Sequence, residues 1–288
     1  MSNTPRDAND MDAAAPAAKR ENPTSTEKGG LESGITRVNN DVGKLQRLEI
    51  DPLRVGRYLG CIICGLVLGG AFANYSIYNV APHPEHEVAD VLKRFDLGHE
   101  PSIPAFYSAV VMLLAAATAA FLAAYDRGAQ MRRRKSWLLL SGVLTLLAID
   151  ENVMFHEMGT AAMNQLGLGG SLHFSWVIPG AIFSVLAAIA FSHLLINLGW
   201  RTRLLFVSSG VIFLAGAIGM EIMASMIFSN AESEMAAVSS LAHVVSQAVE
   251  EALEMAGMAL FFCSLLDFIN LERISLWISS SPSNTGDC

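Results

Sequence analysis

Charged residues are scarce in this chain. Lys, Arg, Asp and Glu make up 16% of the 288 residues, whereas soluble domains carry about 25%. Hydrophobic residues make up 52%, and they gather into runs of about 20 residues with almost no charge, which is the length that crosses a hydrocarbon core of roughly 30 Å. This pattern excludes an ordinary soluble domain. It predicts an all-α fold, a polytopic bundle of transmembrane helices in a lipid bilayer.

Two other features are missing, a disulfide framework and a signal peptide. Four cysteines form no spacing motif that indicates disulfides or metal binding. The first fifty or so residues contain neither an uninterrupted apolar h-region nor a cleavage pattern. They are polar and rich in Ala, Ser, Thr, Pro and Gly, a composition that buries too little apolar surface to fold. We therefore expect residues 1–54 to be a disordered cytoplasmic tail and residues 271–288 to be a short cytoplasmic tail. Nothing in the sequence predicts binding to nucleic acid.

Residues 55–270 are predicted to form the six-helix transmembrane domain. The apolar runs place the spans near residues 57–78, 104–125, 136–158, 174–198, 203–228 and 238–268. Lys and Arg gather before the first span, in the second and fourth connections, and after the last span. The third connection has none, and the fifth, "NAESEMAA", is acidic. Because positive residues favour the cytoplasmic side, both termini are expected in the cytoplasm. The membrane is expected to be the inner membrane of the cell.

The first connection departs from this charge bias, since it carries Lys93 and Arg94. In the stretch "HPEHEVADVLKRFDL", apolar residues recur at helical spacing with polar residues between them. This pattern predicts a short amphipathic helix that lies on the outer surface of the membrane.

The third span ends in an unusual group of titratable residues, "AIDENVMFHE", at positions 148–157. If one helix continues through this stretch, Asp150 and Glu157 share a face at 100° per residue. In the sixth span, "HVVSQAVEEALEMAG", an expected stripe consists of His243, Gln247, Glu250 and Glu254. Glu251 is turned aside from Glu250 by about 100°.

The acidic and histidine residues are expected in two layers in the outer half of the membrane. The deep layer contains Asp150, Glu221, Glu250 and Glu254, with Glu151 at its edge; the shallow layer contains His156, Glu157, His243 and His173. An acidic residue within a membrane costs roughly 2.5–3.5 kcal/mol even on the lenient insertion scale. Since no buried Lys or Arg on these spans is available to pair with them, the sequence predicts a functional site.

Three classes of function fit such a site. The first is a metal-dependent membrane enzyme, a hydrolase or oxidoreductase, with iron, manganese or zinc as the metal. In this hypothesis the ligands are Asp150, His156, Glu221, His243, Glu250 and Glu254, while Glu151 and Glu157 act as catalytic acids or bases. The second class is a proton- or cation-coupled transporter. The third is an accessory or structural membrane subunit. Substrate and homo-oligomer formation stay open at this point.

Two motifs carry a resemblance to known sequences. The chain pairs "DENVMFHE", a DE-x4-HE helix end, with "EEALE", an EE-x2-E motif in the last span. In this pairing it resembles uncharacterised bacterial multi-pass membrane proteins. The resemblance implies a membrane protein and transfers no catalytic role to any residue.

The charge bias makes the topology testable with reporter fusions. A reporter fused after residue 130, in the second connection, should be cytoplasmic, and one fused after residue 232, in the fifth, should be on the opposite side. Alkaline phosphatase and green fluorescent protein fusions read the two sides. If both fusions report the same compartment, the six-span topology is wrong.

Overall fold

The computed structural model describes residues 45–47, 50–80, 86–98, 101–126, 131–167, 174–274 and 277–279. Within these residues, six helical segments are long and apolar enough to cross a membrane: Pro52–Asn79, Ile103–Tyr125, Met131–Val153, Val177–Ile196, Trp200–Asn230 and Leu241–Leu271. This confirms the predicted all-α bundle with six spans. The expected span ends agree within a few residues in most places. The third span is the main exception, because it ends at Val153 rather than at 158.

Several spans are built from more than one element. The first consists of α2 (Pro52–Tyr75) and the π-helix η1 (Ser76–Val80), and the fifth of α8 (Trp200–Leu214), the π-helix η3 (Ala215–Met220) and α9 (Glu221–Asn230). The other four are single helices: α4 (Ile103–Tyr125), α5 (Met131–Val153), α7 (Val177–Ile196) and α11 (Leu241–Leu271). Short helices occupy the connections: α3 (His86–Lys93), α6 (Phe155–Gln165) and α10 (Glu234–Val238). The helix predicted in the first connection is therefore confirmed as α3.

Two three-residue strands, β1 (Leu45–Arg47) and β2 (Trp277–Ser279), pair in antiparallel fashion, with Leu45 opposite Ser279. They belong to a unit of their own, distinct from the helical unit Glu49–Ile274. The strands lie in the segments that the sequence assigns to the two tails, and the disorder expected there stays a prediction. The cytoplasmic position of the termini is likewise a prediction.

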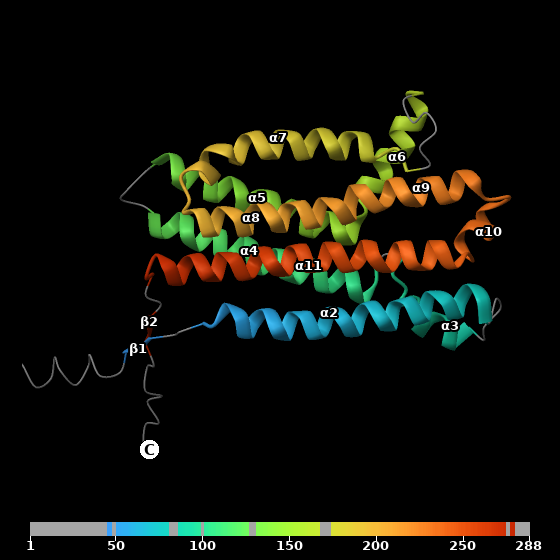
Figure 1. Ribbon diagram of the computed structural model, residues 1–288, viewed down its shortest axis with the longest axis horizontal. Helices are drawn as coiled ribbons and strands as arrows, with labels where there is room; N and C mark the ends of the chain where they lie inside the picture. The colour runs from blue at the N-terminus through green and yellow to red at the C-terminus, as the bar shows by residue number, and fades with distance from the viewer. Residues whose placement is uncertain are drawn as a thin grey trace, which may run out of the picture. The chain divides into compact units, whose positions relative to one another are not determined.

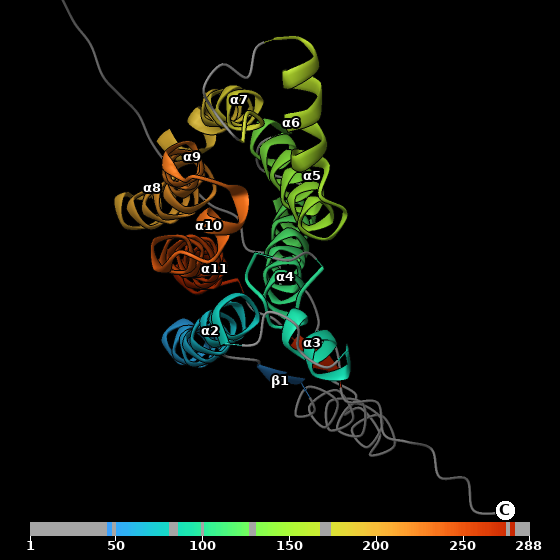
Figure 2. The same ribbon diagram turned by 90° about the vertical axis from the view of Figure 1, so that its right-hand side faces the viewer.

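The helical unit consists of two layers of helices and one further helix, α7, at their edge. One layer contains α2, α11 and the fifth span, with α11 between the other two, and the second contains α4 and α5 (Figures 1 and 2). Helix α7 lies at the edge of these layers, between α5 and α8. The chain enters α2 and leaves α11 at the same end, which we call the proximal end. The opposite end, which holds α3, α6 and α10, is the distal end (Figure 1).

Small residues bring α4 and α5 together. Ala115, Ala116, Ala119 and Ala123 are all buried on α4, as is typical of membrane helices whose backbones approach closely. Nearer the proximal end, Trp137 of α5 is fully buried, and its indole ring packs against Phe206 of α8 and Phe268 of α11. This aromatic group joins the two layers.

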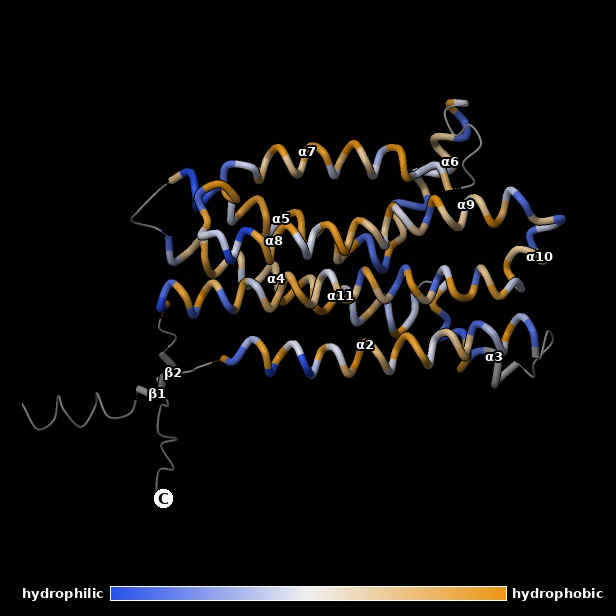
Figure 3. Tube along the Cα trace, in the orientation of Figure 1, coloured by the Kyte–Doolittle hydropathy of each residue, from blue (hydrophilic) through white to orange (hydrophobic). Residues whose placement is uncertain are grey.

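Polar contacts fix the helix ends. At the proximal end, Nη2 of Arg133 donates to Oδ1 of the buried Asp126 at 2.9 Å. Arg203 donates to the carbonyl oxygens of Leu195, Ile196 and Leu198, and so caps the end of α7. Hydrophilic residues concentrate at the helix ends, and they also occur in the distal halves of α5 and α11 (Figure 3). The candidate functional site lies in that distal region.

Candidate functional site

The helix is interrupted between Asp150 and His156, so the prediction of one continuous helix is wrong. Met154 adopts a left-handed backbone conformation, φ 58°, which ends α5 and starts α6 in a new direction. The Asp150 carboxylate accepts the backbone N–H of His156 at 3.0 Å, and its other oxygen lies 3.0 Å from Nδ1 of the His156 ring. The predicted alignment of Asp150 with Glu157 on one helix face is therefore wrong, because the two residues lie on different helices.

A chain of contacts leads from this break to the fifth span. The His156 ring stacks at a tilt on the indole of Trp176, with the ring centroids 4.9 Å apart. Nε1 of Trp176 donates to the Glu221 carboxylate at 3.0 Å. Trp176 itself is held by α6, since its backbone N–H donates to the hydroxyl of Thr160. Asp150, His156 and Glu221, far apart in the sequence, are thus joined through one aromatic side chain.

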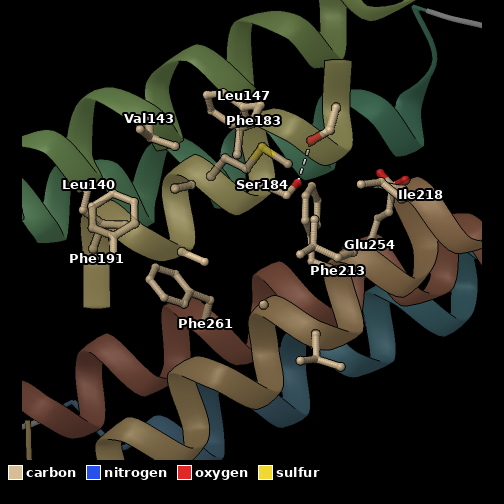
Figure 4. Close-up of a pocket in the computed structure, with 18 of the residues that line it drawn as sticks. Leu140, Val143, Leu147, Phe183, Ser184, Phe191, Phe213, Ile218, Glu254 and Phe261 are labelled. Carbon is tan, nitrogen blue, oxygen red and sulfur yellow. Dashed lines mark hydrogen bonds between the residues drawn. The ribbon is translucent and has the colours of Figure 1, made fainter. Parts of the chain in front are cut away.

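A cavity of about 440 Å³ lies beside this chain of contacts, between α5, α7, the fifth span and α11. Most of its wall is apolar. The aliphatic lining comes from residues such as Leu140, Val143 and Leu147 on α5, and the aromatic lining from Phe183, Phe191, Phe213 and Phe261 (Figure 4). The volume lies within the range of roughly 300–1,000 Å³ that is usual for small-molecule sites.

The distal part of the cavity wall is acidic. Asp150 and Glu151 of α5 and Glu251 and Glu254 of α11 all line it, together with His156 and Trp176. No Lys or Arg is among the described residues of the lining. The cavity therefore combines a long apolar wall with one polar wall that is rich in carboxyl groups.

The position of the predicted α11 stripe relative to the cavity differs from the prediction. Glu254 lines the cavity as expected, but Glu251 also lines it, whereas Glu250 is not among the lining residues. The reason is the contact between α11 and η3. A Cβ atom built on Gly216 would come within 2.9 Å of the Glu250 carbonyl oxygen and 2.8 Å of Cγ of Glu254, so the two backbones meet at this point. The predicted stripe therefore does not line the cavity as a whole, since Glu250 is outside the lining and Glu251, rotated by about 100° from it, is part of the lining.

Other predicted site residues lie apart from the cavity wall. Glu157 is exposed in the first turn of α6, where an acidic side chain favours the helix dipole. His243 is buried in the first turn of α11, and its ring meets that of Phe228 edge to face. Glu221 reaches the cavity wall through Trp176. His173 lies outside the described residues.

The predicted metal ligands do not converge on one point. Among the residues that the structure describes, no group of three or more His, Cys, Asp or Glu side chains is arranged to hold a metal ion. Asp150 is engaged with His156, Glu221 with Trp176, and His243 lies beside Phe228. The metal centre stays a prediction without a preformed set of ligands.

Comparison with protein families gives a match. The family model described as "Domain of unknown function (DUF8692)" matches residues 60–268, which is more than half of the chain. The chain belongs to the DUF8692 family. The DUF8692 region contains all the cavity-lining residues and both motifs that suggested the resemblance to bacterial membrane proteins, and that resemblance itself stays untested. Neither the curated proteins nor the solved structures contain a match.

Sequence reasoning missed Trp176 as a site residue. Its position at the start of a span is typical of an interfacial aromatic residue, and no spacing rule links it to Glu221 or His156. The acidic residues in the spans could have pointed to Trp176. They have no basic partners there, and a buried carboxylate needs hydrogen-bond donors, of which the indole N–H is one.

The Trp176–Glu221 hydrogen bond leads to a stability prediction. Trp176→Phe keeps an aromatic ring against His156 but removes the donor to Glu221. Loss of a hydrogen bond to a charged group should lower the free energy of unfolding by about 1.5–3 kcal/mol. Unfolding in detergent micelles measures this loss. Trp200→Phe is the matched control, since Trp200 is 72% exposed.

A double-mutant cycle isolates the contact from other effects of the substitution. In a Glu221→Leu background, Trp176→Phe should cost much less than in the natural chain. If Trp176→Phe costs the same in both backgrounds, the hydrogen bond contributes nothing to stability.

Proposed function

We propose that the protein binds a lipid-like molecule within the membrane, with its apolar chain in the cavity and a cationic head group at the acidic wall. The observation that carries this proposal is the composition of the cavity wall, apolar along most of its length and carboxylate-rich at its distal part. A ligand with one apolar and one cationic part matches both.

The length of the cavity supports an extended chain. On α5, the lining runs from Leu140 to Glu151, eleven steps along the helix that correspond to about 16 Å. This is about half of a hydrocarbon core of roughly 30 Å. The cavity, acidic wall included, therefore matches the depth of about one leaflet of a bilayer.

The acidic wall supports a positive head group. Four carboxyl groups line the cavity, and the basic group among the described lining residues is His156, which is engaged with Asp150. A cationic ligand would offset the repulsion among the carboxylates. The indole ring of Trp176 adds an aromatic surface, which attracts an ammonium group.

Substitutions on two sides of α7 test whether the ligand binds in the cavity. Ala187 lines it, whereas Val185 is 60% exposed and does not line it. Ala187→Trp should fill the cavity and abolish binding of a long-chain amine, measured by isothermal titration calorimetry in detergent. Val185→Trp, on the same helix, should leave binding unchanged. Equal binding by the two variants would contradict the proposed location.

The head-group preference is tested in the same assay with a matched ligand series: a long-chain amine, the alcohol of the same length and the fatty acid. The amine should bind most tightly. Glu254→Gln should weaken amine binding by about 2–5 kcal/mol, roughly 30-fold or more, because it removes a buried partner of the ligand charge. Binding of the alcohol should change little.

A second candidate is the metal-dependent membrane enzyme expected from the sequence. The observation that favours it is the contact between Asp150 and Nδ1 of His156. A carboxylate that holds one ring nitrogen is the usual partner of a metal-binding histidine, whose other nitrogen then binds the metal. In that case the carboxylates of the acidic wall would have to move closer to one another to bind the metal.

Metal analysis of the purified protein tests this candidate. A metal enzyme should hold iron, manganese or zinc at near-stoichiometric levels, and Asp150→Asn should lower the affinity by roughly 10–100-fold. Glu157→Gln is the matched control, because Glu157 is exposed on α6. A protein free of transition metal after mild purification would favour the lipid-binding proposal alone.

A further inference from the structure

A second buried polar cluster lies at the distal end, between α2, the turn from α3 to α4, and α11. We call it the distal corner; it consists of Asn74, Asp96, His243 and Gln247. Nδ2 of Asn74 donates to Oδ1 of Asp96 at 2.9 Å and to Oε1 of Gln247 at 2.8 Å. The backbone N–H of Gly98 donates to the same Asp96 oxygen at 3.2 Å. None of these four residues lines the cavity described above.

The corner lies inside the helical unit rather than on its surface. Leu97 packs against α2 at Gly70, where a Cβ atom would come within 2.5 Å of the Leu97 side chain. Gly70 is nine residues before the end of the first span at Asn79, which places it roughly 13 Å into that span. The turn between α3 and α4 therefore carries Asp96 inward, and both Asp96 and Asn74 are only 2% exposed.

Among the described residues, the Asp96 carboxylate makes no hydrogen bond to a Lys or Arg side chain. Its hydrogen-bond donors there are an amide side chain and a backbone amide, both neutral. No Lys or Arg forms an ion pair with it within the described ranges. The titratable groups near enough to interact with it electrostatically are Tyr78 and His243. A buried carboxylate is costly unless a cation compensates it.

Two further buried atoms in the corner have unused hydrogen-bonding capacity. Oδ1 of Asn74 and Nδ1 of His243 have no hydrogen-bond partner among the described residues, although both side chains are at least nine-tenths buried. Such atoms are rare in folded proteins and indicate an additional bound species. The Asn74 amide is the same group that joins Asp96 to Gln247.

The oxygen atoms of the corner match a cation. Oδ1 of Asp96 and Oε1 of Gln247 both lie within 3 Å of the Asn74 amide nitrogen. Rotating the amide by half a turn would place its oxygen where its nitrogen now lies, so that one carboxylate oxygen and two amide oxygens would be neighbours, and a cation beside them would offset their repulsion. Carboxylate and amide oxygens are the ligands that hard cations prefer.

We propose that the distal corner binds a monovalent cation, sodium, through Asp96, Asn74 and Gln247. The charge of the bound ion is inferred from the charge of the distal corner. A single carboxylate balances one positive charge, whereas a divalent ion would leave a net charge buried among apolar helices. The bound ion holds α2, the α3–α4 turn and α11 together, and it replaces the hydrogen bonds of the Asn74 amide.

Thermal unfolding of the full-length protein in detergent tests this proposal, with sodium chloride exchanged for choline chloride at constant ionic strength. The melting temperature should rise with sodium concentration and then saturate, by at least about 2 °C. Asp96→Asn should abolish the rise. Asp90→Asn is the matched control, since Asp90 is an exposed carboxylate on α3, and it should retain the rise. Equal melting temperatures in sodium and choline, or a sodium response that persists in Asp96→Asn, would overturn the proposal.

A second variant keeps the proposal falsifiable if Asp96→Asn does not fold. Gln247→Glu adds a second carboxylate to the corner, so the preferred ion should change from sodium to calcium in the same unfolding assay. A calcium response in the natural chain without a sodium response would overturn the assignment of valence. An unchanged ion preference in Gln247→Glu would show that Gln247 does not contact the ion.

Discussion

The contact between Asp150 and His156 is the interaction on which the site depends. Without it, the left-handed residue Met154 would leave the first amides of α6 without a nearby side-chain acceptor, and the Asp150 carboxylate supplies that acceptor. The break sends α6 away from the axis of α5. It also positions His156 against Trp176, which reaches Glu221. A carboxylate at the end of a transmembrane helix therefore holds His156 in place, and through the His156 ring it is connected to Trp176 and Glu221.

Close approach of α11 to the fifth span determines the rest of the acidic wall. Gly216 of η3 faces the α11 backbone at Glu250 and Glu254, and Gly257 of α11 faces the backbone of Phe213, where a Cβ atom would come within 2.7 Å. Two glycines on opposite helices thus allow contact on both sides of one interface. The π-helix η3 lies at this point, and such helices often mark functional sites. This interface orients Glu251 and Glu254 toward the cavity.

The fold was largely predictable from sequence, whereas the site was predictable only in its composition. Apolar length and helical spacing are properties of single segments, so the six spans followed from the first and α3 from the second. Which face of a helix lines a cavity depends on the neighbouring helices, so the sequence alone could not show that Glu251 lines the cavity and Glu250 does not. The break at Met154 has no signal such as Gly or Pro, because its cause is the side chain of Asp150, four residues earlier. Asn74 and Asp96 meet only through tertiary packing.

The loose packing of α7 explains why a cavity exists in this part of the bundle. Only Val177 and Leu194, near its two ends, are buried. The distal end is tied to α6 through Ser175 and Trp176, and the proximal end is capped by Arg203. Between these attachments the helix is free of the close contacts that small residues provide between α4 and α5. A helix that is attached at both ends and little buried in the middle leaves the space that the cavity occupies between α5, α7, the fifth span and α11.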